Sequence, residues 1–139
     1  MIFLDTSAVV AMLAREADGP LLADKLEGAH ERITAGHVIL ESAMRLSSLF
    51  HISPGAADSR VTALLRESSV AVVPITEAIA HGAVAAFERY GKGRKHRASL
   101  NFGDCLSYAC AKAHDAKLLF KGDDFAHTDV ARAYHRSPG

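Results

Sequence analysis

The feature that most constrains the fold of this chain is the alternation of short apolar runs with longer segments of helical periodicity. The runs lie at residues 2–4, 32–35, 70–75 and 117–120. Runs of this length suit strands that are buried on both faces of a parallel sheet. Because right-handed crossovers place helices on both faces of such a sheet, we predict an α/β fold, a three-layer α/β/α sandwich with a short parallel sheet.

The segments between these runs carry apolar residues at helical spacing. Helices are expected over residues 8–14, from Asp18, from His37, from Pro54, from Thr76 to Gly91 and over residues 102–114. For the first helix, Thr6 or Ser7 is the expected N-cap. The helix from His37 is expected to bury the stripe Ile39, Ala43, Leu46 and Phe50, and the helix from Thr76 the stripe Ile79, Ala83, Ala86 and Tyr90.

The length and composition are those of one ordinary globular domain, spanning residues 1–139. The chain has 139 residues, of which 49% are hydrophobic and 23% are charged, and a core of this size folds without disulfides. Its two cysteines, Cys105 and Cys110, are five apart in one expected helix, so their side chains point in different directions. We therefore expect no disulfide, and a reduced, cytoplasmic protein.

Charge and hydropathy exclude several classes of protein. The first acid, Asp5, comes before any apolar stretch long enough for a signal peptide, and no stretch approaches the ~18 apolar residues of a membrane helix. We expect neither an export signal nor a membrane span. Sixteen acids balance sixteen Lys and Arg residues, so the formal net charge is zero. Any binding of nucleic acid must then come from a local basic patch.

Four separate segments each bring a carboxylate toward one edge of the predicted sheet. Asp5 ends the first strand, and the pair Asp123–Asp124 follows the last one. The working crevice of an open α/β sheet lies outside the carboxyl ends of its strands. Glu41 lies about 200° round its helix from Ile39, away from the expected apolar stripe, and Asp104 is in the first turn of its helix. Such a cluster requires a cation.

Each of these acids also has a purely structural explanation. Asp5 can terminate a strand, and Asp104 can serve the helix N-terminus behind an Asn101 cap. Glu41 can be a solvated helix residue, and Asp123–Asp124 can be a plain turn. The convergence of four segments is what favours a functional site.

The residue types predict the kind of metal. Carboxylate oxygens are the ligands that Mg²⁺ and Mn²⁺ prefer, and the eight histidines form no zinc-type pair at a spacing of four. A divalent ion in such a site lowers the pKa of a bound water and activates it as a nucleophile for hydrolysis. Thr6 and Ser7, next to Asp5, are candidates to orient a water or a phosphate oxygen, with helix capping as the alternative.

Four segments in order closely resemble PIN domains, specifically VapC-like toxins. They are Ile-Phe-Leu-Asp-Thr-Ser-Ala at 2–8, Glu41, Asn-Phe-Gly-Asp-Cys-Leu at 101–106 and Leu-Leu-Phe-Lys-Gly-Asp-Asp-Phe at 118–125. The resemblance covers essentially the whole chain. It implies an Mg²⁺- or Mn²⁺-dependent endoribonuclease, the toxin of a toxin–antitoxin pair, that forms a homodimer and binds a cognate antitoxin protein.

The resemblance also implies roles for the acids. Asp5, Glu41 and Asp104 match the metal-site acids of the family pattern. Many relatives carry the fourth acid in a Thr-Arg-Asp-type turn, whereas Gly122 stands near that place here. The fourth catalytic acid is therefore Asp123 or Asp124, and Asp124 is included among the expected metal ligands.

A basic loop precedes Asp104. Residues 91–100 contain two glycines and four positive charges, Lys92, Arg94, Lys95 and Arg97, without an acid. We expect neither regular structure nor burial here. Because the loop leads directly into the helix that bears Asp104, we assign its four charges to the RNA backbone, with a solvated loop as the alternative.

Two other functions are alternatives for a chain with this pattern. A phosphatase of the phosphoaspartate type would have a second aspartate at residue 7, where this chain has Ser7. A receiver domain would have a lone lysine at the end of a late strand, and the sequence does not indicate one. A degenerate PIN fold that acts only as a protein-binding module would have no reason to keep all its acids. Both alternatives are less consistent with the residues than the metal-dependent nuclease.

Overall fold

The structure is a computed structural model that describes residues 1–94 and 96–133. Its centre is a parallel sheet in the order β3-β2-β1-β4, so that the first strand is an inner one. The strands are β1 (Ile2–Leu4), β2 (Arg32–Ala35), β3 (Ala71–Val73) and β4 (Lys117–Leu119). The predicted parallel sheet is confirmed.

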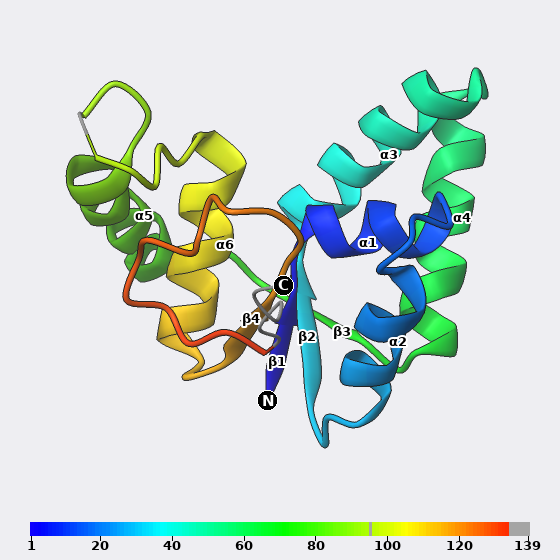
Figure 1. Cartoon of the computed structure of the whole chain (residues 1–139), viewed down its shortest axis with the longest axis horizontal. Coiled ribbons are helices and arrows are strands. Elements are labelled where there is room, and N and C mark those ends of the chain that lie inside the picture. The colour runs from blue at the N-terminus through cyan, green and yellow to red at the C-terminus, as the bar shows by residue number, and fades with distance from the viewer. Residues whose placement is uncertain (95, 134–139) are drawn as a thin grey trace.

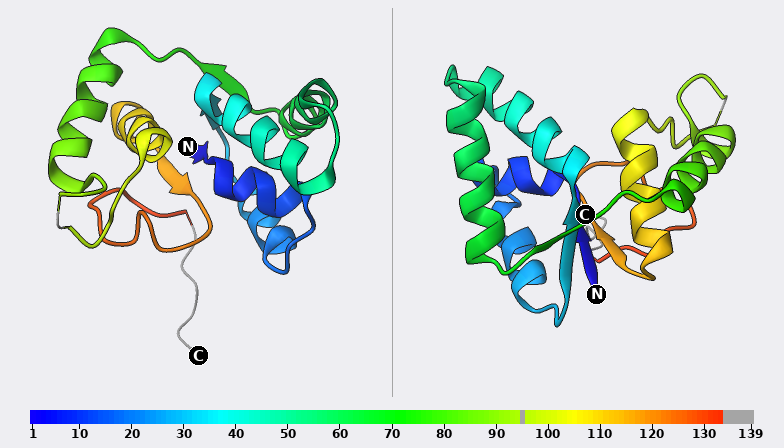
Figure 2. Two further views of the ribbon diagram at one scale, coloured as in Figure 1. Left: turned by 90° about the horizontal axis from the view of Figure 1, so that it is seen from above. Right: turned by 180° about the vertical axis from the view of Figure 1, so that it is seen from behind.

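Helices cover both faces of this sheet. They are α1 (Thr6–Leu13), α2 (Gly19–Glu27), α3 (Gly36–Phe50), α4 (Pro54–Glu67), α5 (Glu77–Tyr90) and α6 (Phe102–Ala113). Helices α1 to α4 lie on one side of the sheet, and α5 and α6 lie on the other (Figure 1). Seen from behind, the chain after β3 crosses in front of the sheet to reach α5 (Figure 2, right). The three-layer α/β/α sandwich is therefore also confirmed.

The core is formed where the apolar runs and the helical stripes meet. Phe3 and Leu4 in the inner strand β1 are fully buried, as a strand covered on both faces requires. The predicted stripe of α5 is buried throughout, at Ile79, Ala83, Ala86 and Tyr90. Both cysteines are buried and free. Among the described residues, no helix is both long enough and apolar enough to cross a membrane.

The predicted stripe of α3 is partly wrong. Ala43 and Leu46 are buried, but Phe50 is 38% exposed and Val38 and Ser42 are buried instead. Phe50 is the last residue of α3, where the helix extends beyond the sheet. There the Arg60 guanidinium covers its ring at 5.5 Å from the centroid.

The prediction for the basic loop is wrong at its ends. Gly91 and Leu100 form a bridge, in which Lys92 N donates to Leu100 O at 2.8 Å, and Ala98 and Leu100 are buried. The side chains of Ala98 and Leu100 thus pack onto the core, which brings the two ends of the loop together. The charged residues Lys92, Arg94 and Arg97 are exposed as expected, while Lys95 lies outside the described residues.

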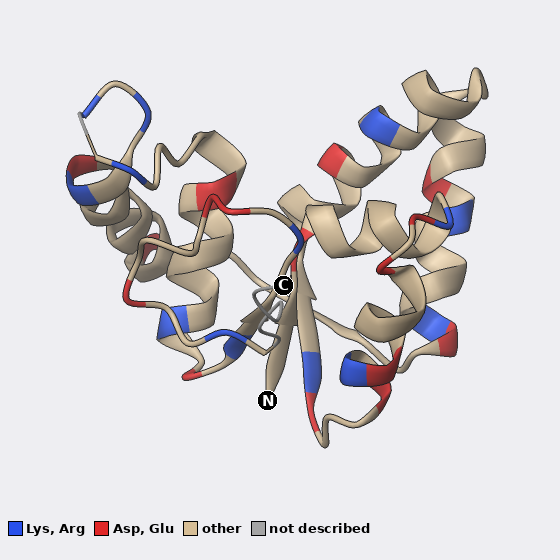
Figure 3. Cartoon of the chain, viewed as in Figure 1, with Lys and Arg blue, Asp and Glu red and all other residues tan. Residues whose placement is uncertain are grey.

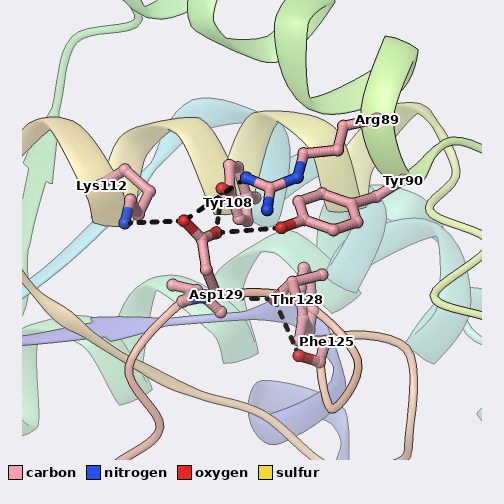
Figure 4. A network of polar contacts seen from close by, with 8 residues as sticks. Arg89, Tyr90, Tyr108, Lys112, Phe125, Thr128 and Asp129 are labelled. Atoms are coloured by element: carbon pink, nitrogen blue, oxygen red, sulfur yellow. Dashed lines mark hydrogen bonds and ion pairs between the residues drawn. The ribbon is translucent and has the colours of Figure 1, made fainter.

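Asp129 fixes the segment after β4 to α5 and α6 (Figure 4). Its Oδ1 accepts a short hydrogen bond from the Tyr108 hydroxyl and a longer one of 3.4 Å from the Tyr90 hydroxyl. Its Oδ2 pairs with Lys112 at 3.3 Å and with Arg89 at 3.8 Å. The Tyr108 hydrogen bond, together with these cations, lowers the pKa of Asp129.

Candidate active site

Asp5 lies at the carboxyl edge of the sheet, immediately after β1. Its backbone N donates to Leu119 O at the end of β4, at 3.1 Å. Beneath it, the buried Thr34 hydroxyl donates to Leu4 O at 2.8 Å and ties β1 to β2. The first acid is therefore held by the ends of three adjacent strands, as the sequence predicted for this edge.

Asp5 itself is the N-cap of α1, so the prediction of Thr6 or Ser7 as the cap is wrong. The carboxylate Oδ2 accepts from Ser7 N at 3.1 Å and from Ser7 Oγ at 2.8 Å, and the residue is 4% exposed. The physical reason is that α1 begins at Thr6 without a linker. The last extended residue before the helix, which is the capping position, is then Asp5.

The hydroxyls of Thr6 and Ser7 join the acids of different segments. Thr6 Oγ1 donates to Glu41 Oε1 at 3.1 Å. Ser7 Oγ donates to Asp5 and accepts from Lys121 N, in the loop after β4, at 2.9 Å. The proton of each hydroxyl is thus committed to a carboxylate, and the two residues connect α1 to α3 and to the last loop.

Glu41 lies one turn into α3 and is half-buried, off the core side of the helix as predicted. Burial raises the pKa of its carboxyl group, the Thr6 hydrogen bond opposes this, and the Asp5 charge raises it further. The charge of Arg45, one turn further along the same helix, lowers the pKa of Glu41.

Asp104 has the capping role that the sequence analysis offered as its structural explanation, and it also lies near the other acids. It completes a capping box, in which Asp104 N donates to Asn101 Oδ1 at 2.9 Å and Asn101 N donates to Asp104 Oδ2 at 3.1 Å. Its pKa is nevertheless raised to about 7, first by burial and then by the charges of Asp5, Asp124 and Glu41. A carboxyl that only capped a solvated helix would have no such neighbours.

The last acid of the group is Asp124. Burial, Asp5 and Asp123 raise its pKa, and Asp124 in turn raises that of Asp104. Of the Asp123–Asp124 pair, Asp124 is thus the member coupled to both Asp5 and Asp104. Gly122 makes the turn possible with φ of +103°, a conformation that L side chains rarely adopt.

The lysine in this loop faces another way. Lys121 Nζ pairs with Glu16 and, at 3.2 Å, with Asp18 in the turn between α1 and α2. Its charge is therefore directed to those two carboxylates. Figure 3 shows acidic positions on α3, on α6 and on the loop after β4 around the upper end of the sheet.

The chemistry of this group fits a divalent ion with oxygen ligands. Four carboxylates, at Asp5, Glu41, Asp104 and Asp124, repel one another across a partly buried space, and a cation would relieve that repulsion. In residues 1–94 and 96–133, no three His, Cys, Asp or Glu side chains already stand in position to hold one ion together. The donors are of the right kind, on four converging segments.

Two polar residues at this site were missed by the sequence reasoning. His37 Nε2 and Ser107 Oγ are 2.8 Å apart and join α3 to α6. His37 is half-buried, and this partial burial lowers its pKa, while Asp5 acts in the opposite direction. The helical spacing was the available indication, because His37 lies one turn before Glu41 and Ser107 lies three residues after Asp104.

The fold and this group define a class of protein: a small α/β domain with an acidic site at the carboxyl edge of a parallel sheet. Residues 2–131 match the family model of the PIN domain. Ribonuclease VapC30 of Mycobacterium tuberculosis is 42% identical over 128 residues, which cover 92% of this chain and 95% of that protein. Ribonuclease VapC of Mycolicibacterium smegmatis is 43% identical over 131 residues, 94% of this chain and 98% of that one.

A solved structure shows the same fold. The crystal structure of Mycobacterium tuberculosis VapC20, described as a sarcin-ricin loop cleaving toxin, superposes with a TM-score of 0.72 and 20% identity, covering 94% of this chain and 97% of that one. The chain belongs to the PIN-domain family. Within it, the chain is a VapC-like nuclease.

Proposed function

We propose that this chain, as a single PIN-like domain over residues 1–139, is the toxin of a toxin–antitoxin pair and cleaves RNA as an Mg²⁺- or Mn²⁺-dependent endoribonuclease. The observation that carries the proposal is the convergence of Asp5, Glu41, Asp104 and Asp124 from four segments, close enough for the other three charges to raise the pKa of Asp104. Carboxylates that are gathered in a partly buried site repel one another, and a bound cation offsets that repulsion, so such a group is typical of a metal-binding functional site. Two buried free thiols are consistent with the cytoplasm as its compartment.

The residues of this chain have distinct tasks in that reaction. Asp5, Glu41, Asp104 and Asp124 would hold the ion, and we place Asp123 outside the ligand set. The chemistry supplied when a divalent ion is bound is activation of water and stabilisation of the charge on the leaving 3′-oxygen. The hydroxyls of Thr6 and Ser7 position two of the acids, and their remaining lone pairs are proposed contacts for water or phosphate.

The test is cleavage of RNA by the purified protein with Mg²⁺, with Mn²⁺ and with a chelator, beside an Asp5→Asn variant. Sequencing the RNA ends that appear after induced expression identifies the target. We expect cleavage with the ions alone and none with the variant. Cleavage by folded Asp5→Asn at the wild-type rate would refute the assigned site, and no uptake of Mn²⁺ by the wild type would favour a non-catalytic binding module.

We assign the RNA backbone to the basic loop, Lys92, Arg94, Lys95 and Arg97. Lys92, Arg94 and Arg97 are exposed, and Figure 3 shows basic positions of this loop at the upper end of the α5–α6 half. Each phosphate neutralised on a single strand contributes a slope of about −0.7 in log K against log salt, so four contacts give about −3 at most.

Replacing Arg94, Lys95 and Arg97 by Ala is expected to weaken RNA binding and flatten that salt slope, while Mn²⁺ affinity stays unchanged. Binding of RNA is measured across a salt series on an Asp5→Asn background, so that the substrate is not consumed. An unaltered slope would show that the loop is only a linker.

The acidic group also suits an antitoxin that inserts a basic side chain. A guanidinium pairs with carboxylates in a bidentate manner and would compete with the ion for them. We expect the cognate antitoxin protein to lose affinity when its Arg and Lys residues in that segment are removed; unchanged affinity would contradict this mode. A homodimer is proposed from the family resemblance and is tested by light scattering.

A further inference from the structure

The Glu41 carboxylate lies directly against the backbone of Gly103, the residue before Asp104. A Cβ atom added at Gly103 would overlap Cδ, Oε1 and Oε2 of Glu41. The side chain of Glu41 and any side chain at residue 103 therefore cannot occupy their places together. Residue 103 is the point at which α6 approaches the acid of α3.

The backbone at this position does not itself require glycine. Gly103 is buried in the first turn of α6 and lies outside the positive-φ region, where glycine is favoured. Glycine in a regular helix costs about 0.5–1 kcal/mol relative to alanine. What requires glycine here is the space that the carboxylate takes.

A second contact fixes α3 to α6 at the same level. The His37–Ser107 hydrogen bond of 2.8 Å lies one helical turn from Glu41 on α3 and one from Asp104 on α6. It sets the distance between the two helices independently of Glu41. With this distance fixed, the room left for the Glu41 carboxylate is decided by residue 103.

We infer that Gly103 is a positioning residue that sets the separation of the Glu41 and Asp104 carboxylates by leaving out a side chain. Without a Cβ there, Glu41 reaches over α6 while keeping its 3.1 Å hydrogen bond from Thr6. A methyl group would push the carboxylate away and break that hydrogen bond. The inference rests on the proposed function, because it assumes that these two acids share a cation.

The test is Gly103→Ala, with Gly82→Ala as its matched control. Gly82 is also helical and faces α6 from α5, although it is exposed, and a Cβ there would meet Ala109 Cβ at an ordinary 3.6 Å. Because the group displaced by Gly103→Ala is the end of a flexible side chain, we expect both variants to keep the wild-type melting temperature within a few degrees. We expect Gly103→Ala alone to lose about 10- to 100-fold in Mn²⁺ affinity, and RNA cleavage with it.

A double variant separates positioning from general damage. Glu41→Asp keeps the carboxylate but shortens the side chain by one methylene. As a single variant it should weaken Mn²⁺ binding, whereas combined with Gly103→Ala it should relieve the overlap with the added methyl group. The combined variant should bind Mn²⁺ more tightly than the product of the two single losses predicts. A crystal structure of metal-free Gly103→Ala should show Glu41 displaced from Thr6.

Three results would overturn the inference: wild-type Mn²⁺ affinity in Gly103→Ala, losses that simply multiply in the double variant, or an undisplaced Glu41. A wild type that neither binds Mn²⁺ nor cleaves RNA would instead refute the proposed function on which the inference rests. The control Gly82→Ala distinguishes an effect of residue 103 from an effect of any added methyl group between helices.

Discussion

Asp104 makes the stability of the metal-free protein depend on pH. Its pKa is about 7 in the folded chain against an ordinary 3.8. Between these values the unfolded chain releases the proton while the folded chain keeps it, so stability falls as pH rises from about 4 to 7. Asp104→Asn removes this loss and keeps an oxygen for the capping box.

In the presence of a chelator, we therefore expect Asp104→Asn to be more stable than the wild type by the order of 1 kcal/mol at pH 8, after allowance for solvent screening. The difference should vanish near pH 4, where both residues are neutral. Thermal unfolding across this range measures it. The same melting temperature at pH 8 would contradict the raised pKa, and Asp123→Asn, at an exposed position, is the control.

The two adjacent aspartates of the last loop should behave differently. The charge of Asp124 raises the pKa of Asp104, and the charge of Asp5 raises the pKa of Asp124, whereas Asp123 acts on the pKa of its neighbour Asp124. Asp124→Asn is expected to lower Mn²⁺ affinity and RNA cleavage by at least about tenfold, and Asp123→Asn by much less. Calorimetric titration with Mn²⁺ compares them. Equal losses would leave the assignment of the fourth acid to Asp124 without support.

Within one element, α3, stability and chemistry are carried by different faces. Leu46 is fully buried, so Leu46→Ala should cost about 2–5 kcal/mol of unfolding free energy. Glu41→Gln replaces a half-buried carboxyl whose pKa is raised, so it should cost little or nothing in stability while removing RNA cleavage. Urea denaturation of both variants checks the contrast, and a large loss for Glu41→Gln would show that Glu41 has a structural role.

The elements that could be predicted from the sequence are those whose burial is local. The strand Ile2–Leu4 is apolar throughout and is buried in the sheet. The apolar stripe of α5 is buried on the side that packs against the rest of the fold, so the hydrophobic pattern alone located both. Phe50 is equally apolar but ends its helix 38% exposed, with the Arg60 guanidinium rather than an apolar side chain against its ring. Ala98 and Leu100 are buried only because the loop closes back on Tyr90, which no periodicity records.

The same distinction holds for the site. Asp5 and the Asp123–Asp124 pair could be placed because they follow strands whose carboxyl ends meet at one edge, although the strand order does not choose between the two aspartates of the pair. The contact of Glu41 with Gly103 and the pairing of His37 with Ser107 join segments about sixty to seventy residues apart. Such contacts depend on how α3 crosses α6, which side-chain periodicity within each helix does not determine.

At the scale of the whole molecule, Asp129 is a single point at which three segments are joined. Asp129→Ala leaves the Tyr108 hydroxyl without its carboxylate and frees the segment after β4 from α5 and α6. We expect a loss of about 1–3 kcal/mol and faster proteolysis after β4, with Mn²⁺ affinity unchanged. Asp58→Ala, at an exposed position on α4, is the control. Wild-type stability would show that the network is dispensable.

The inner position of β1 has a consequence for the synthesis of the protein. Asp5 is made more than a hundred residues before Leu119 of β4, which holds its backbone, and Asp124 follows later still. A ribosome that is still translating this message therefore carries a nascent chain whose cutting site lacks both a neighbouring strand and an acid. A chain that holds all four acids of the proposed site thus exists only once the codon of Asp124 has been read.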